Sequence, residues 1–147
     1  SESPFVYHNL LKDAWAQHLE NEVDATFLDD IVDGCGFEIL NLKALQVSHA
    51  EGEDRHRSEL CTLFIRENKD AFKIDYIAPP EVLKRKDIRL TVDYPEDLIV
   101  CRAVYEAFKH QLPRVELTEV VEFLDRNPEL KKLTAPFCEA GYSTMYL

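Results

Sequence analysis

A ten-residue stretch, Arg89 to Leu98, constrains the fold of this chain more than any other. A short β-prone run ends at Asp93, and two residues later Pro95 is followed by two acidic residues. Proline is favoured at the first position of a helix, where the N–H that it lacks would have no partner. The stretch therefore predicts a strand that runs directly into a helix, with Asp93 at the carboxyl end of the strand.

Two interpretations of Asp93 follow from this position. Ligands collect beyond the carboxyl ends of the strands in open α/β sheets, so a carboxylate there can serve as a Mg²⁺ ligand. Alternatively, Asp93 caps the helix through its first free N–H groups, while Glu96 and Asp97 favour the positive end of the helix. The pattern alone leaves both interpretations open.

The rest of the chain alternates between strand-like and helix-like segments. Four β-prone runs lie near residues 23–28, 36–41, 72–77 and 89–93. The segments between them carry apolar residues three and four positions apart, which is the spacing of amphipathic helices. This alternation predicts an α/β protein with a layered sheet of about four strands and helices on both faces.

Two of the helical segments give detailed expectations. In the segment from Asn9 to Glu22, Asn9 is expected to cap the helix, and Trp15 and His18 to lie in the core or at its edge. After Pro95, the spacing predicts an apolar helix face formed by Leu98, Cys101, Tyr105 and Phe108. Residues 134–147 show no clear period, so we expect a domain over 1–133 and a tail that packs on the domain or on a partner.

Composition excludes several classes of function. The 147 residues carry 17 basic and 28 acidic side chains, a formal net charge of −11, which opposes binding to nucleic acid or to an anionic membrane. The four cysteines lack the spacing of a zinc site. No signal peptide or long apolar run is seen, so we expect a cytoplasmic protein with free thiols.

Three further clusters carry candidate chemistry. Asp29, Asp30 and Asp33 either hold a cation, as in a small acidic metal-binding regulator, or form a solvated loop. Gly34 and Gly36 lie at the start of the β-prone run near 36–41, which indicates a tight turn or a close approach of the backbone to a ligand.

The third cluster is the basic island Arg55-His56-Arg57. Two guanidinium groups can bind a carboxylate or phosphate in a bidentate manner. The neighbouring acids Glu51, Glu53, Asp54 and Glu59 can instead neutralise them in surface ion pairs.

Three of these stretches resemble motifs of the sugar cytidylyltransferases, the family that includes the acylneuraminate, 3-deoxy-manno-octulosonate and spore-coat polysaccharide enzymes. The first is Arg-Leu-Thr-Val-Asp-Tyr-Pro-Glu-Asp-Leu at 89–98, which resembles the late strand–helix signature of the family. Ser1 to Phe5 resembles its G-D-x-P-[FL] segment, and 34–38 resembles its P-x-G-x-x-x-E-[VI] stretch. The resemblance spans roughly residues 1–133.

The resemblance implies roles for individual residues. Asp93 and Glu2 match the two Mg²⁺ ligands of the family, although Glu2 stands where the family has Asp. Gly34 and Glu38 match positions that border the sugar site, and Arg55 and Arg57 are implied to bind substrate. The implied fold is the C-terminal part of a nucleotide-diphospho-sugar transferase, which is Rossmann-like.

The implied reaction is the activation of a sugar acid with CTP, giving a CMP-sugar and pyrophosphate with the help of Mg²⁺. The family's nucleotide-binding loop, rich in Gly, Arg and Lys, is not in this sequence. We therefore expect a C-terminal portion of such an enzyme that is inactive alone, and a homodimer that associates through an exposed strand edge or through Gly34–Arg57. The alternative is a non-catalytic α/β assembly or interaction module derived from the same fold.

Overall fold

The computed structural model describes residues 3–57 and 60–145, with side chains placed as far as Gly141. Its strands are β1 (Ala25–Phe27), β2 (Glu38–Leu40) and β3 (Ile74–Tyr76). Its α-helices are α1 (Leu11–Glu20), α2 (Leu42–Glu51), α3 (Leu63–Glu67), α4 (Pro95–Phe108), α5 (Leu117–Arg126) and α6 (Pro128–Met145). Short 3₁₀ helices are η1 (His8–Leu10), η2 (Asp54–Arg57), η3 (Glu81–Leu83) and η4 (Lys109–Gln111).

The described strands form one mixed sheet in the order β2-β1-β3, with β1 antiparallel to β2 and parallel to β3. Successive side chains of a strand point to opposite faces. Ala25 and Phe27 therefore pack into one apolar cluster with α2 and α3, whereas Thr26 faces α1, where it hydrogen-bonds to His18 at 2.8 Å. Helices cover both faces of the sheet, as the sequence predicts.

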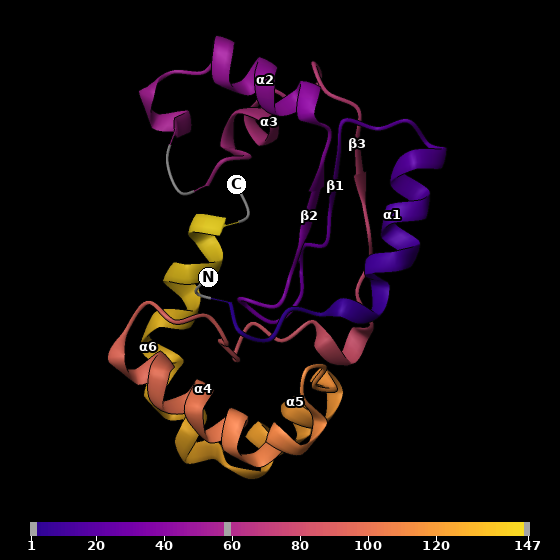
Figure 1. Cartoon of the computed structure of the whole chain (residues 1–147). Helices are drawn as coiled ribbons and strands as arrows, with labels where there is room; N and C mark the ends of the chain where they lie inside the picture. Colours follow the sequence, from indigo (N-terminus) through magenta and orange to yellow (C-terminus); the bar gives the residue numbers. More distant parts are fainter. Residues whose placement is uncertain (1–2, 58–59, 146–147) are drawn as a thin grey trace.

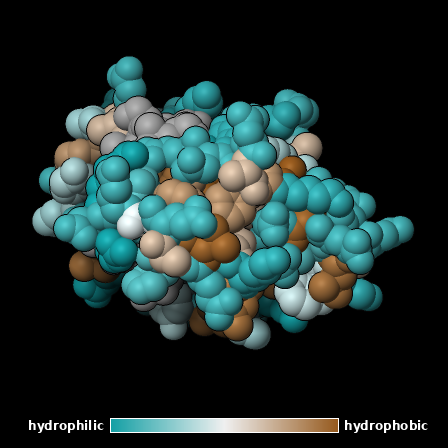
Figure 2. All heavy atoms as spheres, turned by 90° about the horizontal axis from the view of Figure 1, so that it is seen from above, coloured by the Kyte–Doolittle hydropathy of each residue, from teal (hydrophilic) through white to brown (hydrophobic). Residues whose placement is uncertain are grey.

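The helices divide between the sheet and one of its ends (Figure 1). In that view α1 runs along one side of the strands and α2 and α3 lie at the upper end, while α4, α5 and α6 gather below. The larger apolar core lies between the loop after β1 and the lower helices, and includes Leu28, Ile31, Val104 and Leu124. Seen from above, the surface is mainly hydrophilic, with hydrophobic residues exposed among the hydrophilic ones (Figure 2).

The expected fourth strand at 89–93 is reduced to a single bridge between Asp33 and Arg89. The N–H of Leu90 donates to the carbonyl of Asp33 at 2.8 Å. Gly34 has a φ of +83°, so the chain turns away directly after Asp33. The partner backbone leaves before a longer ladder can form, so the sheet of about four strands that the sequence predicts has three strands among the described residues.

Two helix expectations are wrong in detail. Trp15 is 53% exposed and stacks on His18 at the edge of α1, while His18 is buried. In α4 the buried face consists of Val100, Cys101, Val104 and Phe108, with Leu98 and Tyr105 exposed. Asp97 is fully buried in the first turn, and this anchor sets the rotation of the helix that follows it.

Most of the segment 134–147, which we expected to be a tail, belongs to helix α6. Pro128 starts α6 at the position favoured for proline, and α6 packs against α4 and α5. Phe137 stacks on Tyr94 with a centroid distance of 4.1 Å and an interplanar angle of 12°. Among the described residues, no helix is long and apolar enough to cross a membrane.

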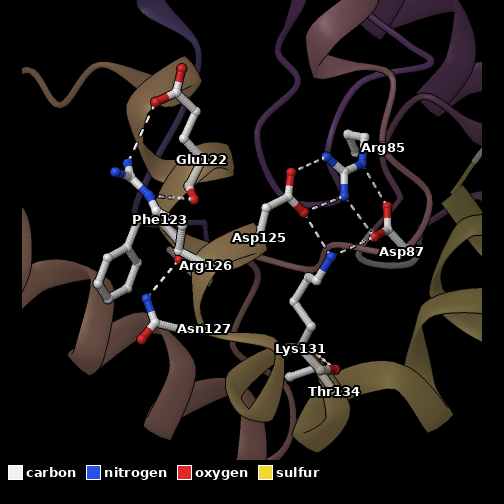
Figure 3. A network of polar contacts seen from close by, with 9 residues as sticks. All are labelled: Arg85, Asp87, Glu122, Phe123, Asp125, Arg126, Asn127, Lys131 and Thr134. Carbon is white, nitrogen blue, oxygen red and sulfur yellow. Dashed lines mark hydrogen bonds and ion pairs between the residues drawn. The ribbon is translucent and has the colours of Figure 1, made fainter.

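A network of four charged side chains ties the loop before Arg89 to α5 and α6 (Figure 3). The guanidinium of Arg85 donates to Asp87 at 2.8 Å and to Asp125 at 2.7 Å. Lys131 donates to the same carboxylates, at 3.1 Å and 2.7 Å. Hydrogen bonds from Arg85 lower the pKa of Asp87 to about 2 and lower that of Asp125 as well.

This network predicts acid sensitivity. Carboxylates with lowered native pKa values stabilise the fold above their unfolded pKa of about 4, and that contribution is lost as the pH falls from about 4 to about 2. We expect the free energy of unfolding, measured by urea denaturation, to fall less between pH 5 and pH 2.5 in Asp125→Asn than in the wild type. Glu122→Gln, which removes only an exposed pair with Arg126, should fall as the wild type does. Equal slopes for wild type and Asp125→Asn would contradict the assignment.

Candidate functional site

A buried guanidinium organises the end of the sheet where Asp93 lies. Arg89 donates through Nη1 to Asp33 at 2.7 Å and through Nε to Asp97 at 3.0 Å. Its Nη2 pairs with Asp93. The three acids come from the loop after β1, from the end of the 89–93 run and from the first turn of α4, so one side chain joins three segments.

The cluster carries more negative than positive charge. Burial raises the pKa of Asp33, and the Arg89 charge only partly offsets this effect. The Oδ1 atom of Asp33 is buried without a hydrogen-bond partner in the described structure. Burial opposes the charge on Arg89, but Asp97 and Asp33 outweigh it and raise the pKa of the guanidinium. Gly141 of α6 lies directly over the pair of Arg89 and Asp33, where a Cβ atom would collide with both.

Asp93 differs from the other two acids because its side chain is 44% exposed. It does not cap α4. The Oδ2 atom of Asp97 accepts the backbone N–H groups of Asp93 and Tyr94, each at 3.0 Å, so the capping role expected for Asp93 belongs to Asp97. Asp33 and Asp97 are thus committed to the fold, and Asp93 is the acid of this cluster that can meet a ligand.

Asp93 is suited to bind Mg²⁺ as one carboxylate ligand. Mg²⁺ is commonly bound by one or two carboxylates together with water and substrate phosphates, and Asp93 can supply one of them. Among the described residues, no group of three His, Cys, Asp or Glu side chains could hold a metal ion. Glu2, the second ligand implied by the resemblance, lies outside the described residues.

Gly34 and Glu38 line one cavity of about 180 Å³. The deeply buried Arg66 of α3 also lines it, donating to both oxygens of Asp29 at 2.8 and 3.0 Å and to Glu38 at 2.7 Å. Its guanidinium stacks over Phe27 at 3.9 Å. Asp29 and Glu38 outweigh the burial of Arg66 and raise its pKa, so it stays charged. We call this cavity the Glu38 pocket.

The polar groups of the Glu38 pocket are chiefly acceptors. Thr62 donates its hydroxyl to Glu38 at 3.0 Å, and Arg66 holds the same oxygen. The other carboxylate oxygen of Glu38 is not used in these bonds. Burial and the charge of Glu38 raise the pKa of the Cys61 thiol in this pocket, which disfavours a nucleophilic thiolate.

The close backbone approach predicted at Gly34 is present, but the partner is the chain itself. A Cβ atom on Gly34 would lie 2.6 Å from the backbone nitrogen of Thr91. The Asp33–Gly34 link therefore connects the two parts of the site, because Asp33 contacts Arg89 and Gly34 lines the Glu38 pocket.

The basic island lies apart from this pocket. Arg55 pairs with Glu53 at 3.3 Å and Arg57 with Asp54 at 3.1 Å, which is the surface pairing that the sequence left open. Arg55 also pairs with Glu67 at 2.6 Å, a partner that the sequence analysis did not name. Nδ1 of His56 accepts the Glu53 N–H, so its Nε2 carries the proton toward Glu67. Neither ring nitrogen of His56 is left to act as a general base.

The acidic loop does not gather into a cation site. Asp29 is held by Arg66 and Asp33 by Arg89, so two of the three acids serve different arginines. The metal-regulator reading therefore has no support in the side-chain arrangement. Arg66 itself was not singled out by the sequence analysis; its only signal is an arginine that directly follows the apolar residues 63–65.

Comparisons with known proteins point to one fold. The chain is 32% identical over 125 residues to the uncharacterised protein MJ1063 of Methanocaldococcus jannaschii, matching 84% of this chain and 50% of that protein. It is 27% identical over 129 residues to the spore coat polysaccharide biosynthesis protein SpsF of Bacillus subtilis, matching 87% of this chain and 53% of that protein. No family model matches. The chain spans about half the length of these relatives.

A cytidylyltransferase from Leptospira borgpetersenii has a similar structure, with a TM-score of 0.74 and 20% sequence identity over 88% of this chain and 55% of that one. At this identity the likeness establishes the fold. The chain has the mixed α/β fold of part of a cytidylyltransferase.

The geometry predicts opposite consequences for two acids of the Arg89 cluster. Asp97→Ala should lower the free energy of unfolding by about 3 kcal/mol, because a fully buried partner of Arg89 and two capping bonds are lost together. Asp93→Ala should cost less than about 1 kcal/mol, because its carboxylate is partly solvated. Urea denaturation of both variants measures the difference, and equal losses would contradict the division of roles.

Proposed function

We propose that this chain forms the sugar- and metal-binding part of a nucleotidyltransferase that activates a sugar acid with CTP, giving a CMP-sugar and pyrophosphate. The observation that carries the proposal is the connection of Asp93 to the Glu38 pocket through the Asp33–Gly34 link. The cytidylyltransferase fold and the similarity to SpsF support the reaction class.

In this proposal the Glu38 pocket holds the sugar. Glu38 and Asp29 accept hydrogen bonds from sugar hydroxyls, and Arg66 fixes both carboxylates in place. Such bonds are specific because an unpaired acceptor in a confined site is costly. The carboxylate of a sugar acid faces two acids and one arginine here, so it points out of the pocket toward solvent or toward the metal.

In the proposal Asp93 would hold Mg²⁺, and a bound ion would draw charge from the phosphate of the cytidylyl group that is transferred. Arg89 keeps Asp93 oriented and leaves part of its carboxylate exposed. Asp33 acts on the site through Arg89, and Asp97 acts both through Arg89 and through the hydrogen bond that it accepts from the Asp93 N–H. The proposed homodimer would use the segment Gly34–Arg57, which contains the edge strand β2.

This chain alone should not catalyse the reaction. A triphosphate is usually bound by a glycine-rich loop whose N–H groups and lysine surround the phosphates, and the sequence contains no such loop. We expect no pyrophosphate release above background in a coupled assay with CTP, Mg²⁺ and a panel of sugar acids. Turnover that Asp93→Asn abolishes would show that the chain binds the nucleotide without that loop.

Sugar binding is expected even without turnover. In a ¹⁵N–¹H chemical-shift titration with N-acetylneuraminate, signals of Gly36, Cys61 and Thr62 should move, and Glu38→Gln should weaken binding about tenfold. Glu53→Gln, an exposed acid outside the pocket, is the matched control and should bind as the wild type does.

Two outcomes would revise the proposal. If a neutral hexose binds as tightly as N-acetylneuraminate, the substrate is still a sugar, but the proposal that it is a sugar acid is wrong. Binding of neither ligand would favour the non-catalytic assembly module, since the pocket would then have lost its substrate.

A further inference from the structure

The outer edge of β3 has no neighbouring strand among the described residues. The sheet has the order β2-β1-β3, so β3 pairs with β1 on one side and is open on the other. Every residue of the segment 73–77 is half-buried or exposed, and Tyr76 is 50% exposed. An accessible strand edge is a template for a further strand, which a protein must either block or use.

The ladder with β1 shows which backbone groups of β3 are available to such a strand. The carbonyl of Lys73 accepts an N–H of β1 at 3.3 Å, and the N–H of Ile77 donates to a carbonyl of β1 at 2.9 Å. The backbone groups of successive strand residues point alternately to the two sides of the strand. Asp75 therefore faces β1 as well. The N–H and C=O groups of Ile74 and Tyr76 face outward.

The charged side chains of β3 leave this edge open. Lysine is a residue type that proteins use to block strand edges, but the ammonium group of Lys73 donates to the carbonyl of Asn21 at the end of α1. The side-chain amides of Asn21 and Gln17 donate to Oδ2 of Asp75 at 2.6 and 3.3 Å. The other carboxylate oxygen of Asp75 is not used in these bonds, so it can accept from a further cation.

The edge is complementary to itself in one antiparallel register. A two-fold axis at Ile74 pairs this residue with its own copy through the outward N–H and C=O groups of both chains. Lys73 of each chain then lies directly opposite Asp75 of the other, in a pair of the kind whose Cα atoms are about 4.5 Å apart. Moving the axis by one residue would place two lysines or two aspartates opposite each other, and like charges in that position destabilise a sheet.

The other face of the same register brings apolar side chains together. Ile74 and Phe72 belong to the apolar cluster that β1 forms with α2 and α3. The half-exposed ring of Tyr76 lies on this face, 5.8 Å from the ring of Phe27. With the axis at Ile74, Tyr76 of one chain lies opposite Phe72 of the other, and cross-strand aromatic pairs stabilise antiparallel sheets.

We propose that β3 pairs with β3 of a second copy of this chain, in the antiparallel register centred on Ile74. The pairing joins the two sheets into one continuous sheet, with an ion pair between Lys73 and Asp75 on each side of the axis. Strands β3 and β2 are opposite edges of the described sheet, so this surface is separate from the segment Gly34–Arg57. The inference does not rest on the catalytic proposal.

The backbone pairing is tested by sedimentation velocity at high salt, where the repulsion between two chains of net charge −11 is screened. We expect a dimer that dissociates on dilution. Tyr76→Pro removes an outward N–H and keeps the ladder with β1, as proline does on edge strands. It should dimerise at least about tenfold more weakly than Tyr76→Thr, the matched control that loses the same ring and keeps the N–H. Circular dichroism checks that both variants are folded.

The register is tested by reversing the charge pair. Lys73→Glu should weaken dimerisation, because two acids then face each other on both sides of the axis. The double variant Lys73→Glu, Asp75→Lys reverses each pair and should recover most of the loss, which a residue that stabilises only the single chain would not produce. Lys132→Glu makes the same change in net charge on α6 and should dimerise as the wild type does.

Hydrogen exchange locates the interface. The amides of Ile74 and Tyr76 should be protected in the dimer and exchange rapidly in the diluted chain, whereas those of Asp75 and Ile77, which face β1, should be protected in both. A single monomer boundary at high salt and high protein concentration would overturn the proposal. A dimer that persists unchanged in Tyr76→Pro, with rapid exchange at Ile74, would also overturn it and would place the interface elsewhere.

Discussion

The buried guanidinium of Arg89 is the interaction on which the lower half of this protein depends. It is 4% exposed and binds carboxylates from three segments that are far apart in sequence or belong to different elements. A buried cation is tolerated only when carboxylates and good hydrogen-bond geometry compensate for the loss of water. The start of α4, the turn after Asp33 and the position of Asp93 are consequences of meeting that requirement.

The same requirement shapes the candidate site. Arg89 pairs with the buried Asp33 and Asp97 and with Asp93, whose side chain is 44% exposed, and that difference in exposure separates structural acids from the one able to bind a ligand. On the other side of the Asp33–Gly34 link, Arg66 arranges Asp29 and Glu38 in a parallel way. The two arginines therefore organise two acidic environments that share one loop.

The sequence pattern correctly predicted the features that depend on neighbouring residues, such as the start of a helix and the positions of strands. Pro95 begins α4, and three of the four β-prone runs form strands within one or two residues of their expected positions. The failures depend on distant contacts. The burial of Asp97 decides which face of α4 is buried. The turn at Gly34 prevents a fourth strand, because the backbone next to Arg89 changes direction there. Helix α6 is stabilised by packing on α4 and not by a clear apolar period in its sequence.

The site residues divide in the same manner. Gly34 and Glu38 lie together because short segments join them, whereas the pairing of Arg66 with Asp29 and Glu38 across 37 and 28 residues has no local signal. Arg55 and Arg57 pair with acids of their own segment, Glu53 and Asp54, and Arg55 also pairs with Glu67 of α3. Sequence spacing alone cannot predict which of several acids pairs with an arginine, because burial and geometry decide the pairing.

The central claim is that Asp93 and the Glu38 pocket form one metal-assisted site. Paramagnetic broadening by Mn²⁺, used in place of Mg²⁺, tests it in ¹⁵N–¹H spectra of the chain. The account predicts strongest broadening at Val92 and Tyr94, weaker broadening at Gly36, and loss of both in Asp93→Asn. Broadening centred on Asp29 and Asp30, or unchanged in Asp93→Asn, would contradict it.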